Sequence, residues 1–182
     1  MRFLRLFGSF WIFPLLAASL IYITSHIEVQ RQYRELLWLF PIGVFAWTLL
    51  EYVLHRFFFH IHLDFASHLS HHAAPRDPDK LLVRPHYGLG ISAVLFGILY
   101  LTAGSLFTAV GVLTGIWAGF LYYEAVHYRV HLSTAPSGII ARQRRAHFYH
   151  HFTNQERCFG VTSPLWDYLF RTLRNSDFGC RI

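Results

Sequence analysis

The sequence contains a long uncharged run from Tyr87 to Tyr123, and this run restricts the possible folds more than any other feature. At about 1.5 Å per residue, one helix of this length would extend ~55 Å, nearly twice the ~30 Å hydrocarbon core of a bilayer. We therefore expect the run to fold back on itself at Ala103-Gly104-Ser105. The two resulting helices are predicted over about residues 87–103 and 106–126.

Two further apolar runs precede this one, over residues 7–25 and 36–55, and each is long enough to cross a bilayer. The composition agrees, because 54% of the residues are hydrophobic and only 14% are charged, which is not typical of a soluble globular protein. The sequence thus predicts an all-α integral membrane protein with four transmembrane helices. We expect residues 1–182 to form a single domain.

The basic residues predict the orientation in the membrane. Four crossings place both chain ends on one face, together with residues 56–86 and 127–182. Fourteen of the sixteen Lys and Arg residues lie on that face, and only Arg31 and Arg34 lie on the other. By the positive-inside rule, the sequence predicts a multi-pass protein with both termini and a helical cap in the cytoplasm. The membrane would be a bacterial inner membrane or the endoplasmic reticulum, and no nucleic-acid partner is expected.

Ten of the thirteen histidines fall into four groups whose spacings are typical of metal ligands. Two groups have the pattern HxxHH, in which positions i, i+3 and i+4 share one face of a helix. Neutral imidazole is the commonest protein ligand for transition metals. Because all four groups belong to the cap or to helix ends on its side, they can meet there. The candidate ligands are His55, His60, His68, His71, His72, His127, His131, His147, His150 and His151.

Ten imidazoles exceed the needs of one metal ion, so we expect a di-metal site with about four or five ligands to each ion. Histidine by itself does not distinguish Zn, Fe, Cu and Ni. His55 and His60 lie about 140° apart on an ideal α-helix, so either the chain leaves that helix near Phe58 or the two side chains serve different metals.

Two glutamates are candidates for residues that orient these histidines. Glu51 lies one turn before His55, and Glu124 lies three residues before His127. Each is expected to accept a hydrogen bond from the ring nitrogen that does not bind metal, which would fix the tautomer and orientation of the ring. The alternative for each is a carboxylate at the membrane interface that pairs with an arginine.

Several longer motifs resemble the fatty acid hydroxylase superfamily of histidine-rich membrane di-metal enzymes, and within it the fatty acid 2-hydroxylase branch. The resemblance covers about residues 45–173. Its motifs are Glu51-Tyr52-Val53-Leu54-His55 continuing to His60, His68-x2-His71-His72-x2-Pro75, Tyr123-Glu124-x2-His127-Tyr128-x2-His131, His147-x2-His150-His151-Phe152, Phe159-Gly160-Val161-Thr162-Ser163 and Leu165-Trp166-Asp167-Tyr168.

The resemblance implies that the ten clustered histidines bind two iron ions, which zinc can replace in purified protein, and that O2 is a co-substrate. The implied reaction is hydroxylation of a lipid acyl chain at C2 of a fatty acid or fatty acyl amide. Relatives often have aspartate at the position of Glu124. Because the sequence contains no HPGG haem signature, we expect two electrons from another protein, such as cytochrome b5 or a ferredoxin with its reductase.

Two alternative functions remain open from the sequence. The same scaffold serves sterol- or carotenoid-type hydroxylases and desaturases. A divalent-metal transporter is the alternative of another class. Transport sites lie near the middle of the bilayer with access from both sides, whereas these histidines gather at the cytoplasmic ends of the predicted helices.

Overall fold

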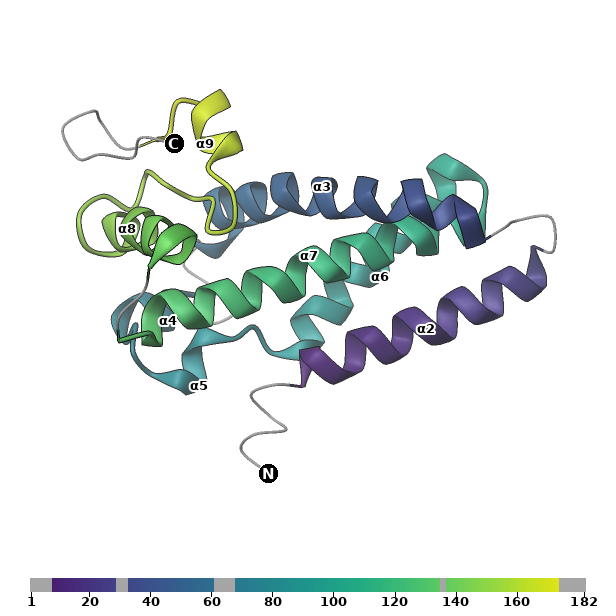
Figure 1. Ribbon diagram of the computed structural model, residues 1–182, viewed down its shortest axis with the longest axis horizontal. Coiled ribbons are helices and arrows are strands. Elements are labelled where there is room, and N and C mark those ends of the chain that lie inside the picture. Colours follow the sequence, from purple (N-terminus) through teal and green to yellow (C-terminus); the bar gives the residue numbers. More distant parts are fainter. Residues whose placement is uncertain (1–7, 29–32, 61–67, 135–136, 174–182) are drawn as a thin grey trace. The chain divides into compact units, whose positions relative to one another are not determined.

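The computed structural model describes residues 8–28, 33–60, 68–134 and 137–173, and in these ranges all regular structure is helical (Figure 1). The all-α prediction is therefore confirmed for the described residues. Residue 7 of the first predicted crossing and residues 61–67 and 174–182 of the predicted cap lie outside them. The helices are α2 (Ser9–Ile27), η1 (Tyr33–Glu35), α3 (Leu36–Leu54), η2 (His55–Phe59), α4 (His68–Ala73), α5 (Pro78–Leu81), α6 (Pro85–Ala103), α7 (Leu106–Leu132), α8 (Gly138–Phe152) and α9 (Leu165–Leu169).

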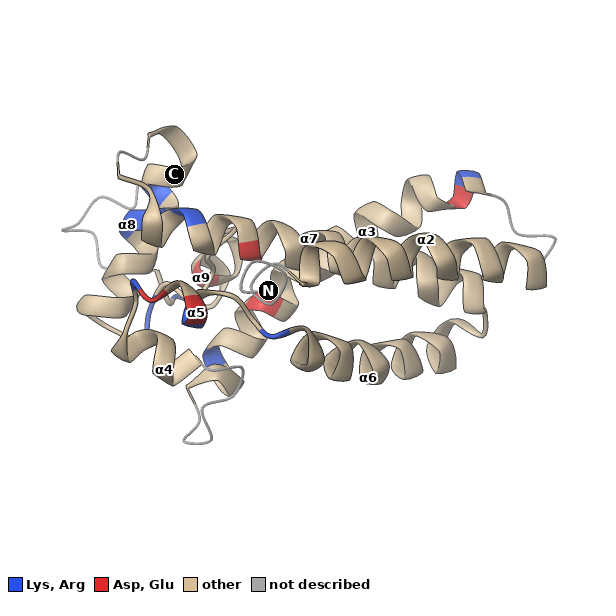
Figure 2. Cartoon of the chain, turned by 90° about the horizontal axis from the view of Figure 1, so that it is seen from below, with Lys and Arg blue, Asp and Glu red and all other residues tan. Residues whose placement is uncertain are grey.

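Four helical stretches in the described residues are long and apolar enough to cross a membrane: Ser9–Ile27, Tyr33–Phe59, Pro78–Ala103 and Leu106–Leu132. They match the four predicted crossings, and α2 and α6 contain no Lys, Arg, Asp or Glu (Figure 2). Helix α7 continues six residues beyond the predicted limit of 126. The prediction ended the helix where the sequence becomes polar, but backbone hydrogen bonds of a helix continue through polar residues when their side chains are satisfied.

The predicted hinge between the last two long helices is confirmed. Gly104 has a φ of +63°, a conformation that glycine adopts without strain, and its N–H donates to the carbonyl of Tyr100. The next helix is capped by Glu28, whose carboxylate accepts from the N–H of Leu106 at 2.6 Å and from the hydroxyl of Ser105 at 2.7 Å. A carboxylate at this end satisfies free N–H groups and interacts favourably with the helix dipole.

The chain divides into two compact units. One consists of Met1–Trp47 with Val83–Leu121, and the other of Thr48–Leu82 with Tyr122–Ile182. Helices α3 and α7 continue from the first unit into the second. The prediction of a single domain over 1–182 stays a prediction.

The first unit is organised around α7, which lies between α2 and α3 (Figure 1). Phe13 of α2 packs against Trp117 and Phe120 of α7, with ring centroids 5.2 and 5.5 Å apart. From α6, the Ser92 hydroxyl accepts a hydrogen bond from Trp117 Nε1 at 2.7 Å. Since α7 is mostly buried while the other long helices expose apolar side chains such as Trp38, the outer helices have faces suited to lipid.

Gly111, Gly115 and Gly119 recur at i+4 steps on α7, and this stripe of small residues allows α3 to approach closely. A Cβ added at Gly115 would overlap the carbonyl oxygen of Phe40, and one at Gly119 would lie 2.5 Å from the Trp47 side chain. The stripe is thus a packing feature of the first unit. The second unit contains the ten clustered histidines.

Candidate metal centre

The ten predicted ligands form two groups of five, and within each group the candidate ligand nitrogens lie within 4.8 Å of one another. Two groups of five agree with the expected number of ligands for two ions. We call them the first and second clusters. The first cluster consists of His55, His60, His68, His72 and His150, and the second of His71, His127, His131, His147 and His151.

Each HxxHH motif contributes to both clusters. In α4, His68 and His72 belong to the first cluster, while His71 belongs to the second. In α8 the i, i+4 pair of histidines belongs to the second cluster and His150 to the first. Positions i and i+4 differ by only about 40° around a helix, whereas i+3 lies about 60° to the other side of i. The motif therefore supplies two ligands to one cluster and one to its neighbour.

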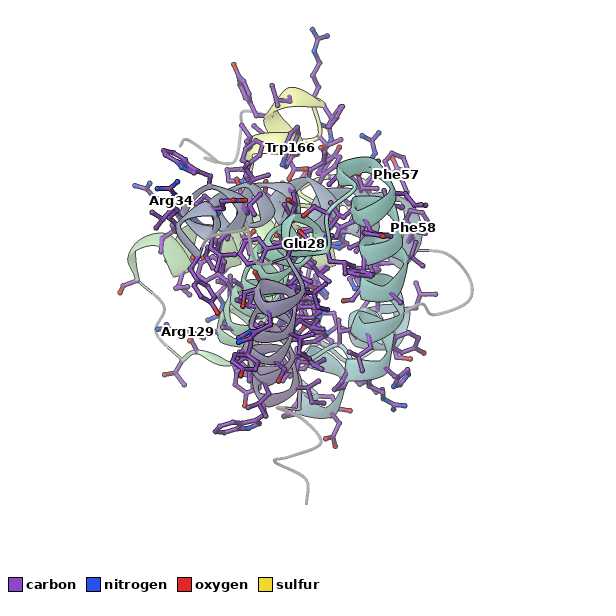
Figure 3. All side chains as sticks on the ribbon, turned by 90° about the vertical axis from the view of Figure 1, so that its right-hand side faces the viewer. Glu28, Arg34, Phe57, Phe58, Arg129 and Trp166 are labelled. Atoms are coloured by element: carbon purple, nitrogen blue, oxygen red, sulfur yellow. The ribbon has the colours of Figure 1, made fainter. Side chains whose placement is uncertain are left out.

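A π-helix brings His55 and His60 into the same cluster. Residues His55–Phe59 form η2, directly after α3, which confirms the predicted departure from α-helical geometry near Phe58. In a π-helix, residues i and i+5 are one hydrogen-bonded turn apart. The two imidazole rings stack with centroids 5.4 Å apart at 11°. Phe57 and Phe58, labelled in Figure 3, are 55% and 46% exposed and so face away from the cluster.

The Nε2 atoms of the second cluster converge too closely to be explained by hydrogen bonds alone. Consecutive Nε2 atoms lie 2.8 to 3.1 Å apart in the order His127, His71, His151, His147 and His131. A ring nitrogen carries one hydrogen or one lone pair, so the three inner nitrogens cannot each satisfy both of their contacts. A cation between the lone pairs resolves this conflict, and these residues therefore fit a metal ion.

The first cluster has the same kind of convergence. The Nε2 atoms of His68 and His72 lie 2.9 Å apart, and those of His60 and His150 lie 3.2 Å apart. Among the residues that the structure describes, Nε2 of His55 is buried without a hydrogen-bond partner. Since buried polar atoms rarely lack partners, this nitrogen also fits a site for a cation.

Backbone carbonyls fix the tautomer of three of the clustered histidines. Nδ1 of each ring donates to a carbonyl, so in the neutral ring Nε2 presents its lone pair. Each cluster contains at least one histidine held by a carbonyl in this way. The pairs are His55 with Phe159, His127 with Leu81 at 2.8 Å, and His150 with Arg157 at 2.9 Å.

Burial keeps the histidines outside the membrane-length helices neutral. It lowers the pKa of His72 to about 4 and that of His150 to about 3. It also lowers the pKa of His60, His68, His71, His147 and His151, and repulsion from neighbouring imidazoles acts in the same direction on the last four. Since a metal ligand must be deprotonated, these rings need not lose a proton at neutral pH before binding metal.

The predicted role of Glu51 does not match its contacts. Its buried carboxylate accepts from the backbone N–H of Val161 at 2.5 Å, from the N–H of Thr162 at 2.9 Å and from the Thr162 hydroxyl. Among the described residues its hydrogen-bond donors are therefore backbone amides and a hydroxyl, rather than a histidine or an arginine. The reason is that the carbonyl of Phe159 already accepts from Nδ1 of His55. Glu124 is also buried, but Nδ1 of His127 donates to the Leu81 carbonyl and Nε2 faces the second cluster, so the predicted hydrogen bond from His127 to Glu124 does not match the contacts.

Sequence reasoning missed the residues that hold the histidines in place. The carbonyls of Leu81, Arg157 and Phe159 are backbone atoms, which leave no signal in side-chain identity. Asp167 is 1% exposed and accepts from the N–H groups of Phe159 and Gly160. An acidic residue among apolar and aromatic neighbours, as in Leu165-Trp166-Asp167-Tyr168, is the sequence signal that could have identified Asp167.

The family model for fatty acid hydroxylase matches residues 40–172, which include all ten histidines. The chain belongs to the fatty acid hydroxylase family. The resemblance inferred from the histidine motifs is thus confirmed.

Relatives of this fatty acid hydroxylase family member include the fatty acid 2-hydroxylase of Homo sapiens, which is 36% identical over 149 residues. The dihydroceramide fatty acyl 2-hydroxylase FAH2 of Arabidopsis thaliana is 36% identical over 139 residues. These matches cover 74% and 72% of this chain but only 39% and 58% of the two relatives. The chain therefore spans less than two thirds of either.

A solved structure of scs7p, described as full length with only the hydroxylase domain visible, has a similar fold. The TM-score is 0.76 at 28% sequence identity, over 92% of this chain and 67% of that one. The ceramide very long chain fatty acid hydroxylase SCS7 of Saccharomyces cerevisiae is 30% identical over 195 residues, which cover 94% of this chain and 50% of that protein.

Proposed function

We propose that this protein is a di-iron oxygenase that hydroxylates a lipid acyl chain at C2 of a fatty acid or fatty acyl amide. The observation that carries the proposal is the grouping of ten histidines into two five-membered clusters within a fatty acid hydroxylase domain. Relatives named as fatty acid 2-hydroxylase and dihydroceramide fatty acyl 2-hydroxylase support the substrate class and the position.

One ion would be held by each cluster, and zinc can take the place of iron during purification. Iron held there would supply the oxidising chemistry: one atom of O2 would be inserted into the C2–H bond, and the other would be reduced to water by two electrons and two protons. A separate protein, such as cytochrome b5 or a ferredoxin with its reductase, donates the electrons.

The protein's own residues set the geometry and charge of this centre. Neutral imidazoles contribute no negative charge, so the bound ions keep their full positive charge. The carbonyls of Leu81, Arg157 and Phe159 hold three rings with Nε2 directed into the clusters. Glu124 is proposed to orient a neighbouring histidine. Burial of the second cluster excludes water that would otherwise compete for the ions.

The orientation belongs to the same proposal. The histidine cap and both termini face the cytoplasm, where soluble or membrane-bound electron donors are available. The excess of basic residues on that side of the predicted crossings supports this orientation.

The test is mass spectrometry of lipids from cells that express the protein under 18O2. We expect one 18O atom in a hydroxyl group at C2 of an acyl chain. The variants His71→Ala and His150→Ala each remove one ligand, from the second and first cluster respectively, and should abolish the labelled product. His86→Ala is the matched control, because His86 is exposed and belongs to neither cluster.

Two results would contradict the proposal. Label on a ring carbon would indicate a sterol- or carotenoid-type enzyme. No labelled lipid in cells that contain the iron-loaded protein would argue against an oxygenase and favour metal transport.

A further inference from the structure

Two buried carboxylates bind the backbone of residues 159–162, and residues 157–162 are called the clamped segment. All five N–H groups from Cys158 to Thr162 have acceptors from outside the segment. The N–H groups of Phe159 and Gly160 donate to Asp167 at 3.0 and 2.7 Å, those of Val161 and Thr162 donate to Glu51, and that of Cys158 donates to the Thr172 carbonyl at 2.9 Å.

Two carbonyls of the same segment face the first cluster. The carbonyl of Arg157 accepts from Nδ1 of His150, and that of Phe159 accepts from Nδ1 of His55. Between them Cys158 has a φ of +58°, a left-handed conformation that is uncommon for a residue with a side chain. Such a conformation persists only where surrounding contacts hold it. In the second cluster, the carbonyl that accepts from His127 belongs to Leu81, outside the segment.

We infer that Asp167 is a positioning residue for the first cluster. Together with Glu51, Asp167 holds the clamped segment so that its carbonyls orient His55 and His150. The inference rests on the metal centre proposed above, and it assigns different supports to the two clusters. Loss of Asp167 should therefore weaken metal binding at the first cluster and leave the second unchanged.

A directed hydrogen-bond chain fixes Asp167 itself. The Thr172 hydroxyl donates to Oδ1 of Asp167 at 2.7 Å, so its single hydrogen is used and it must accept from the Tyr52 hydroxyl at 3.1 Å. The Tyr52 oxygen in turn accepts from Arg56 at 2.6 Å. The chain runs from a guanidinium to a carboxylate, so every donor has the acceptor it needs.

Different surroundings of Asp167 raise and lower the pKa of its carboxyl group. Burial raises the pKa of the carboxyl group, while the bonds from Thr172, Gly160 and Phe159 and the positive charge of Arg56 lower it. With three donors directed at two oxygens, the site is built for the ionised form. Gly160 is also needed, because a Cβ there would overlap the Ser163 carbonyl and lie 3.0 Å from Oδ2 of Asp167.

The first test compares Asp167→Asn with Glu156→Gln as the control. Glu156 is an exposed acid in the loop just before the clamped segment, so the control removes the same charge without touching the network. Asparagine replaces one acceptor oxygen with a donor, which leaves one N–H group facing another. Iron-loaded protein is treated with increasing chelator, and the metal remaining per chain is measured by mass spectrometry.

In Asp167→Asn, we expect the chelator concentration that removes one of the two bound iron ions to fall about tenfold or more. Loss of a group that supports a ligand typically costs 10- to 100-fold in metal affinity. The other iron ion should be retained as in the wild type, and Glu156→Gln should lose both ions at the wild-type chelator concentrations. Equal loss of both ions, or retention of both as in the wild type, would overturn the inference.

A second readout needs no metal. Cys158 is 2% exposed, so its thiol should react slowly with a maleimide in metal-free protein in which Cys180 is replaced by Ser. Asp167→Asn should raise the labelling rate about tenfold, the factor expected when one buried hydrogen bond is lost, and Glu156→Gln should not. An unchanged rate would overturn the inference. A wild type that binds no metal would instead refute the proposed function, and the labelling rates would still report whether Asp167 holds the segment.

If Asp167→Asn fails to fold, Thr172→Val is the milder variant. It removes one of the three donors to Asp167 and keeps the backbone carbonyl that accepts from Cys158. We expect changes in the same direction but smaller, in both chelator resistance and labelling rate. If both ions in Thr172→Val resist the chelator as well as they do in the wild type, the inference is again overturned.

Discussion

The contact between α3 and α7 predicts a large effect for a single methyl group added at Gly115. The new Cβ would overlap the carbonyl oxygen of Phe40 and lie 2.8 Å from Cα of Gly43 and 2.9 Å from N of Val44. All three are backbone atoms of α3, so no side-chain rotation can relieve the contact. The two helices must separate.

The expected magnitude follows from these distances. Carbon atoms in van der Waals contact lie about 3.5–4.0 Å apart, so α3 must move by ~1 Å. Inserting a methyl group into a well-packed interior typically costs ~1–3 kcal/mol. Gly97 of α6 offers a matched control, because a Cβ added there would meet none of the described residues within 4 Å. Both substitutions gain the same helix propensity, so we expect Gly115→Ala to be less stable than Gly97→Ala by about 2 kcal/mol in free energy of unfolding.

The assay is unfolding in mixed micelles of rising SDS content, followed by tryptophan fluorescence and circular dichroism. Gly97→Ala should unfold at the wild-type midpoint or above it, and Gly115→Ala should unfold below both. Coincident midpoints for the two variants would refute the close approach of α3 and α7. A loss of stability in Gly97→Ala would show instead that the glycine backbone itself matters.

Other predictions concern the metal centre and the membrane. Gently purified protein should hold two metal ions per chain by elemental analysis, and His71→Ala should hold fewer while His86→Ala holds two; one ion or none in the wild type would contradict the centre. Because burial lowers the pKa of His72 to about 4 and that of His150 to about 3, the unfolded chain binds more protons than the folded protein below about pH 6.5. The melting temperature of metal-free protein should therefore be highest above pH 6.5 and fall on acidification toward pH 4, and a rise would argue against neutral buried rings. A reporter inserted beside Asp77 should be active only in the cytoplasm, and activity only on the outer side would overturn the orientation.

Much of the site could be predicted from spacing along the chain. The HxxHH motifs identified their six histidines because residues on one helix face stay together wherever that helix packs. The 140° conflict between His55 and His60 located the departure from α-helix, but not that it is a π-helix. Spacing explains why each HxxHH motif divides two and one between the clusters, but which cluster receives the pair depends on how α4 is turned toward α8.

The long apolar helices could be predicted from local sequence, since an uncharged run such as Tyr87–Tyr123 and the position of Gly104 are local properties of the chain. Which groups satisfy the buried polar atoms depends instead on how the helices and loops pack. Glu51 was expected beside His55 but accepts from backbone amides 110 residues away in sequence, and Asp167 supports the segment whose carbonyl holds that histidine. Hydrogen bonds of this kind depend on where distant backbone atoms come to lie, and those positions have no counterpart in residue spacing.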